Sequence, residues 1–177
     1  VHTTILKEAQ EAAEQTLARL PKGAARNPRN QKQIAAPWLV HKIFGQWSRV
    51  LEVKPPADGA PYLSGMWAYT QGSAHIAQKA FSQAREHLTA LEAFVELSRK
   101  DAGQAGATPN ARILELAALS LRGELLEATG DLDGAIKAFE TGVALEDLNN
   151  YTEPPDWPQP LRHYLGAALL KANRAAD

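Results

Sequence analysis

The chain has 177 residues, no cysteine, and 19 basic against 20 acidic side chains. This balance argues against nucleic acid or an anionic membrane as the main partner, since both attract a basic excess. The absence of cysteine excludes disulfides, thiolate zinc sites and cysteine nucleophiles. Alanine, the strongest helix former, supplies 32 residues, and no stretch alternates cleanly with period 2. We therefore expect an all-α protein.

The N-terminal third predicts three helices. Apolar residues recur at helical spacing over residues 3–20, and a Pro-Lys-Gly sequence ends that helix. Residues 22–32 form a polar, basic linker, which we interpret as a solvated connection rather than a phosphate-contacting loop. A second helix is expected over 31–44, with Pro37 either kinking it or marking its start. A short helix over 47–53 follows.

The middle of the chain predicts longer helices. Residues 61–78 and 80–100 carry apolar residues at helical spacing, and the small, glycine-rich residues of 101–108 predict a loop. Thr108 followed by proline is typical of a helix N-cap, so a further helix is expected up to residue 129. That helix is apolar nearly all round, which indicates packing on both sides. An amphipathic helix over 132–143 follows.

The segment 151–160 holds four prolines and is expected to be an extended, stiff connection. Asp156, with Gln159 three residues later, matches a capping box. We therefore expect the last helix to run over 157–173, with Trp157 at its start.

Segments of the chain repeat one arrangement of small and bulky residues. Gly123, Gly130, Leu132, Ala135 and Phe139 stand at positions 8, 15, 17, 20 and 24 of a helix-turn-helix unit of about 34 residues. Small residues at positions 8 and 20 let two antiparallel helices approach closely, which predicts that Gly123 and Ala135 face each other. Three other segments fit the same frame, and they are centred on Gly45, Gly72 and Gly166.

This arrangement resembles the tetratricopeptide repeat (TPR). The resemblance implies a TPR-like α-solenoid of antiparallel helix pairs with irregular long loops, formed by a single helical-repeat domain over residues 1–177. After the helix at 3–20, its pairs would cover about 31–54, 61–100, 109–147 and 157–177.

Several short sequence segments narrow the resemblance to one group of TPR proteins. Residues 37–40 (Pro-Trp-Leu-Val), 44–47 (Phe-Gly-Gln-Trp), 151–157 (Tyr-Thr-Glu-Pro-Pro-Asp-Trp) and 165–170 look like the C-terminal half of a family of mostly bacterial, multi-repeat TPR proteins. The resemblance implies a scaffold rather than a reaction. It also implies that residue 1 lies inside a longer protein.

No constellation of residues points to catalysis or to a metal. The five histidines form no pair spaced i, i+4 on one helix, and we interpret them as packing residues. Four acidic residues near the prolines could supply the carboxylate pair of a glycoside hydrolase, but a capping role for Asp156 is the simpler interpretation. These four are Glu146, Asp147, Glu153 and Asp156. We expect no catalytic residue, no metal and no cofactor.

In TPR proteins the concave face is lined by fixed positions of each first helix, and the resemblance carries these positions onto all four pairs. The implied partner-binding residues are Lys32, Leu39, Lys42, Met66, Tyr69, Ser73, Glu124, Glu127, His163 and Lys171, with Ile43 and Leu170 beside them. Tyr69 is either the aromatic anchor of this groove, flanked by Lys42 and Glu124, or it packs within its own repeat.

The leading hypothesis is a non-catalytic interaction or scaffold module that binds a peptide or a partner protein in the concave groove. The alternative is a helical-repeat enzyme or a small-molecule binder that uses a closed pocket. The charge balance leads us to expect no nucleic-acid partner. We expect no membrane partner either, since no apolar run reaches the roughly 18 residues of a membrane span. The sequence leaves the compartment, cytoplasmic or periplasmic, open.

The last predicted pair supplies little beyond its first helix. Leu165, Leu169 and Leu170 should therefore lack part of their cover. We expect another chain, a further part of the protein or a neighbouring molecule to bury this edge, and self-association is one form of that contact.

Overall fold

The computed structural model describes residues 2–57, 60–102, 108–149, 153 and 155–174, and all regular structure within these ranges is helical. The α-helices are α1 (His2–Ala18), α2 (Pro28–Ile43), α3 (Trp47–Glu52), α4 (Pro61–Ala77), α5 (Phe81–Ala102), α6 (Pro109–Thr129), α7 (Leu132–Glu146) and α8 (Leu161–Lys171), with a short 3-10 helix, η1 (Ala24–Arg26). The expected all-α class is confirmed for this part of the chain.

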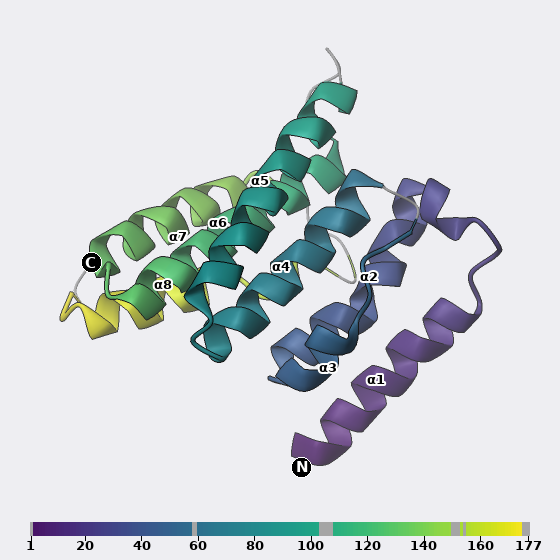
Figure 1. Ribbon diagram of the computed structural model, residues 1–177, viewed down its shortest axis with the longest axis horizontal. Coiled ribbons are helices and arrows are strands. Elements are labelled where there is room, and N and C mark those ends of the chain that lie inside the picture. The colour runs from purple at the N-terminus through teal and green to yellow at the C-terminus, as the bar shows by residue number, and fades with distance from the viewer. Residues whose placement is uncertain (1, 58–59, 103–107, 150–152, 154, 175–177) are drawn as a thin grey trace.

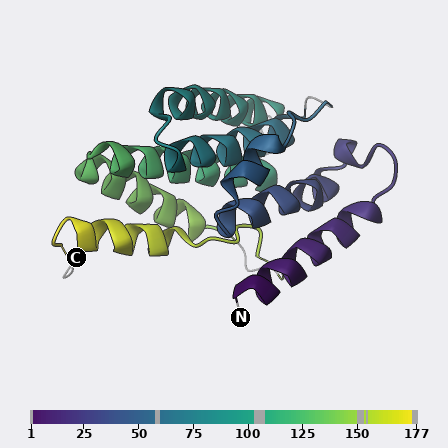
Figure 2. The ribbon, with the colours of Figure 1, turned by 60° about the horizontal axis from the view of Figure 1, so that its bottom comes forward.

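The helices pack against their neighbours in chain order (Figure 1). Helices α2, α4 and α6 form a row, because α4 contacts both of the others. Helix α5 packs on α4 and α6, and α7 packs on α6 and α8. Helix α1 packs on α2, so α1 and α8 lie at opposite ends of the array (Figures 1 and 2).

The same turn ends four helices, α2, α4, α6 and α8. In each, one residue adopts a left-handed backbone, and its N–H and the next N–H bond back to the carbonyls three and five residues earlier. This is the hydrogen-bond pattern of a Schellman turn. After the first three turns a new helix begins two residues later. The left-handed residues are Gly45 (φ 66°), Lys79 (φ 59°), Gly130 (φ 93°) and Asn173 (φ 57°).

Glycines allow the closest helix crossings. A Cβ built on Gly123 would lie 2.3 Å from the Phe139 ring of α7, and one built on Gly72 would lie 2.6 Å from Leu121 of α6. Neither space can hold a side chain without repacking. The residue predicted to face Gly123 was Ala135. Ala135 is fully buried, but the atoms nearest to Gly123 belong to Phe139.

Helix α2 begins earlier than its predicted start at residue 31. The Asn27 side chain accepts a hydrogen bond from the Arg29 N–H at 3.0 Å, and Pro28 takes the first helical position, where its missing N–H costs nothing. Pro37 lies inside the helix and does not mark its start. The predicted linker 22–32 is therefore shorter, and it contains η1.

The predicted start of the last helix at residue 157 is wrong, and so is the predicted capping box. Helix α8 begins at Leu161, after Pro158 and Pro160, because a residue that precedes proline is disfavoured in the helical conformation. The Leu161 N–H donates to the Glu146 carboxylate at 2.9 Å. Asp156 forms an ion pair with Lys32 at 2.6 Å.

Candidate functional site

The face formed by α2, α4 and α6, here called the inner face, is partly covered by the protein's own chain. The covering segment is residues 155–160, here called the strap, which leads into α8 (Figure 2). Trp157 of the strap is buried, and its ring centroid lies 5.5 Å from that of Tyr69 on α4. The ion pair between Asp156 and Lys32 ties the strap to α2. The expected extended connection is wrong over 156–159, where the chain bends. This proline-rich segment is held on the inner face by aromatic and ionic contacts.

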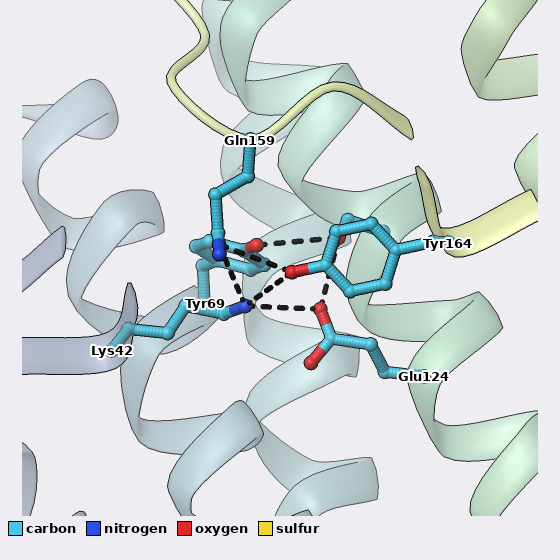
Figure 3. Close-up of polar contacts among 6 residues, drawn as sticks. Lys42, Tyr69, Glu124, Gln159 and Tyr164 are labelled. Carbon is cyan, nitrogen blue, oxygen red and sulfur yellow. Dashed lines mark hydrogen bonds and ion pairs between the residues drawn. The ribbon is translucent and has the colours of Figure 1, made fainter. Parts of the chain in front are cut away.

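A buried polar cluster lies beneath the end of the strap. Figure 3 shows its side chains converging from α2, α4, α6, the strap and α8 on the ammonium of Lys42. Lys42 Nζ lies 3.3 Å from the Glu124 carboxylate. It donates to Gln159 Oε1 and to Tyr164 Oη, each at 3.2 Å, and it stands 4.8 Å from the centroid of the Tyr69 ring. Attraction to the ring faces adds to these polar contacts.

The oxygens of the cluster are also bonded to one another. The Ser120 hydroxyl donates to Glu124 at 2.9 Å and lies 3.2 Å from the Tyr69 hydroxyl. The Tyr164 hydroxyl donates to Gln159 Oε1 at 3.1 Å. With Lys42 included, the network therefore connects all three helices of the row with both the strap and α8. We define the polar cluster as Lys42, Tyr69, Ser120, Glu124, Gln159 and Tyr164.

The positive charge of Lys42 in the polar cluster is balanced by the groups that it contacts. Burial opposes the charged form of Lys42, but the Glu124 carboxylate and the tyrosine oxygens outweigh it and hold its pKa well above the usual value. Burial raises the pKa of the Tyr69 phenol, so that this residue stays protonated. A lysine held as ammonium is a hydrogen-bond donor and not a nucleophile. The cluster is thus suited to holding the strap in place.

The inner face remains open next to α1. A groove of about 530 Å³, here called the open groove, lies between α1, α2 and the strap. Ile43 is 40% exposed beside it, and Leu39 is half-buried in its wall. Its lining is mostly apolar and consists of Ala12, Ala13, Thr16, Lys32, Gln33, Ala36, Leu39, Val40, Ile43, Tyr62, Pro155, Asp156 and Pro158.

A second hollow of about 930 Å³ shares the pair of Lys32 and Asp156 with the open groove. It is lined by the first turns of α2, α4 and α6, among them Pro28, Pro61 and Pro109. The ion pair therefore stands between an apolar groove and a more polar hollow.

The predicted binding residues divide into three groups. Lys42, Tyr69 and Glu124 are brought together as expected, but Lys42 and Tyr69 are buried, as are Met66 and Ser73, so none of these four lines an open surface. These positions do not form an open groove: Trp157 of the strap packs on Tyr69, Tyr164 of α8 bonds to Lys42, and Met66 and Ser73 are buried. Lys32 and Leu39 line the open groove. The remaining residues lie near α8: Glu127 pairs with Lys171, and His163 is exposed.

Sequence reasoning missed the residues that close the face. Ser120, Gln159 and Tyr164 belong to the polar cluster, and Trp157 packs on Tyr69 instead of starting a helix. A usable signal was present at Trp157, since a tryptophan between prolines, outside any helix, has few ways to bury its ring except against another element.

The acidic residues that were considered for catalysis make structural contacts. Glu146 caps α8, Asp147 forms a two-point ion pair with Arg162 at 2.8 Å, and Asp156 binds Lys32. Within the described residues, no group of three or more His, Asp or Glu is arranged to hold a metal ion. Over the same residues, no helix is both long and apolar enough to cross a bilayer.

No family model matches this chain, and no match is found among curated proteins or among solved structures. Membership of the TPR proteins therefore stays a prediction.

Proposed function

We propose that this chain is a non-catalytic protein-interaction module, and that the open groove binds a peptide segment of a partner protein. One observation carries the proposal: a non-helical segment of the chain itself, the strap, already lies on the same inner face. The open groove adjoins that segment and is lined mostly by aliphatic side chains. A face that holds one non-helical segment and stays open beside it has room for a second one.

We propose further that the helices form a TPR-like α-solenoid. Two features support this arrangement. The four helix-ending turns recur with the same hydrogen bonds, and Gly72 and Gly123 stand seven residues before the turn where another element crosses closely. In such arrays the inner helices present the binding face.

The lining defines the class of partner. Leu39, Val40 and Ile43 offer aliphatic contacts along α2, and two prolines of the strap form the opposite wall. Lys32 at the end of the groove is neutralised by Asp156, so charge contributes little there. The expected partner is a peptide segment with apolar side chains, whose affinity comes mainly from burial of apolar surface.

A peptide-display selection against the whole protein tests the proposal. Peptides enriched on the wild type are measured against Ile43→Arg, which places a charge in the open groove. Leu97→Arg is the matched control, because Leu97 is an exposed leucine on α5, outside the groove lining. We expect the dissociation constant to rise at least about tenfold for Ile43→Arg and to stay unchanged for the control. Enriched peptides that bind both variants equally, or no enriched peptide at all, would refute the proposal.

A further inference from the structure

The hollow beside the open groove collects the N-terminal ends of the whole row. The first turns of α2, α4 and α6 all line this hollow of about 930 Å³, here called the polar hollow. Each of the three helices begins with a proline, and these are Pro28, Pro61 and Pro109. The backbone N–H groups of a first turn lack partners within their own helix and carry partial positive charge. Three such ends around one hollow favour a bound anion.

The middle helix of the row begins without a side-chain cap. The Asn27 side chain caps α2 by accepting from the Arg29 N–H at 3.0 Å. The Thr108 hydroxyl caps α6 by accepting from the Ala111 N–H at 3.1 Å. At α4 the cap position is Ala60, whose side chain cannot accept a hydrogen bond. An anion from outside the chain can therefore take the place that a capping oxygen fills in α2 and α6.

A buried side chain points to a ligand independently of the helix ends. Tyr62, in the first turn of α4, is only 4% exposed, yet it lines both the polar hollow and the open groove. Its hydroxyl makes no hydrogen bond to any residue that the structure describes. Burial, and then the charge of Asp156, raise the pKa of this phenol, so the group stays a neutral donor. A buried donor without an acceptor is costly, and an anion in the hollow supplies that acceptor.

The charged groups of the polar hollow leave one cation available to a ligand. Lys32 and Asp156 neutralise each other in their ion pair at 2.6 Å. Glu153, a second carboxylate of the lining, is exposed, so solvent screens its charge. Arg29 has no acidic partner among the described residues. Its guanidinium can bind two oxygens of one phosphate group through parallel hydrogen bonds.

We propose that the polar hollow binds a small molecule through a phosphate group, which lies at the start of α4. The Tyr62 hydroxyl and the Arg29 guanidinium donate to the phosphate oxygens, and the uncapped first turn stabilises the same negative charge. Since the hollow is larger than a phosphate ion, Ser98 and Asn110 are available to the rest of the molecule. This site stands apart from peptide binding in the open groove, because Arg29, Ser98 and Asn110 do not line that groove.

Calorimetric titration of the whole protein with glycerol phosphate, at constant ionic strength, tests the site. Inorganic phosphate, glycerol and acetate are the comparison ligands. Tyr62→Phe removes only the hydroxyl, and Arg29→Gln removes the charge. Arg49→Gln is the matched control, because Arg49 is an exposed arginine on α3, outside the lining of the polar hollow. Since the Tyr62 hydroxyl has no acceptor, Tyr62→Phe should melt at or above the wild-type temperature.

A further variant fills the site from within the chain. Ala60→Asp places a carboxylate at the cap position of α4, where it accepts from the first-turn N–H groups and takes the place of the phosphate. Stability and binding should then move in opposite directions, with a higher melting temperature and at least about tenfold weaker binding of glycerol phosphate.

We expect glycerol phosphate to bind the wild type and Arg49→Gln with equal affinity, inorganic phosphate to bind as well, and glycerol not to bind. Tyr62→Phe and Arg29→Gln should each bind glycerol phosphate at least about tenfold more weakly. Ile43→Arg, which blocks the open groove, should leave this affinity unchanged. Absence of phosphate binding, or equal binding by Tyr62→Phe, would overturn the proposal. Tighter binding of acetate than of inorganic phosphate would also overturn it, because the hollow would then select a carboxylate.

Discussion

The two halves of the inner face are built from the same row of helices but meet different surroundings. In the half around α4 and α6, the strap and the polar cluster cover Tyr69, and the other predicted contact residues on α4 are buried as well. In the half formed by α1 and α2, aliphatic side chains of the same row stay open beside a groove. A repeat position therefore does not fix a residue's role by itself. What covers the position decides whether the side chain stabilises the fold or can meet a partner.

The largest effect should come from the polar cluster. Glu124→Ala removes the carboxylate that balances Lys42, whose side chain is only 3% exposed. An uncompensated buried ammonium is costly, and we expect a loss of about 3–5 kcal/mol in the free energy of unfolding, measured by urea denaturation. Glu127→Ala is the control, because its partner Lys171 is largely exposed, and it should cost under about 1 kcal/mol. Equal losses would mean that the closed half is no more stabilised than the surface.

Removing the ring of Trp157 should come next. Trp157→Ala leaves a cavity against Tyr69 and releases the strap from the inner face. Buried tryptophans typically contribute about 3–5 kcal/mol, and the lower end is expected here because the indole N–H has no partner among the described residues. The variant should also make Tyr69 accessible, which tyrosine nitration followed by mass spectrometry can detect. Nitration of Tyr69 that is equal in variant and wild type would contradict the covering role of the strap.

The boundary between the halves should be less sensitive. Lys32→Ala breaks the ion pair with Asp156, in which the two side chains are 28% and 30% exposed. Pairs of this kind contribute about 0.5–1 kcal/mol, and the contribution should shrink as salt is added. Thermal melts at low and high salt measure it. A salt-independent difference between variant and wild type would show that packing, rather than charge, fixes the strap to α2.

The contact between α4 and α5 offers a pH test that leaves the inner face untouched, because His87 of α5 stacks on His75 of α4 with 5.3 Å between the ring centroids. Burial, and then the neighbouring His75, lower the pKa of His87 from its usual 6.5. Above that value both folded and unfolded states hold the ring neutral. Below it the unfolded state takes up the proton first, so stability falls until the pH passes the lowered folded pKa. The effect should be small because His87 is half-buried. The test is to measure the melting temperatures of the wild type and of His87→Gln between pH 7.5 and 5. The same dependence of melting temperature on pH in both proteins would exclude His87 as the titrating group.

The smallest effect on stability is expected in the open half. Ile43→Arg changes a side chain that is 40% exposed and should alter the free energy of unfolding by no more than about 0.5 kcal/mol. The same variant is expected to weaken peptide binding at least tenfold. A large loss of stability would show that Ile43 belongs to the core. Weaker peptide binding by this variant would then reflect unfolding and not a contact in the groove.

The sequence predicted the helices better than it predicted the site. Local signals were sufficient at Thr108 and Pro109, where the N-cap hydrogen bond to Ala111 is present, and at Gly130, which ends α6 with a left-handed backbone. The start of α8 was mispredicted because a local pattern at Asp156 competed with a distant lysine. The burial of Tyr69 depends on Trp157, 88 positions away in the chain. Helical periodicity carries no information about which segment crosses which face.

The contacts of Lys42 have a kinetic consequence. They join residues 117 and 122 positions apart, Gln159 and Tyr164, whereas the helix pairs are closed by turns of a few residues. Closing so long a loop costs more chain entropy than pairing neighbouring helices, so these contacts should form after the rate-limiting step of folding. Substitutions in the strap should then accelerate unfolding and leave the refolding rate nearly unchanged. The strap would thus lengthen the lifetime of the folded state without speeding its formation.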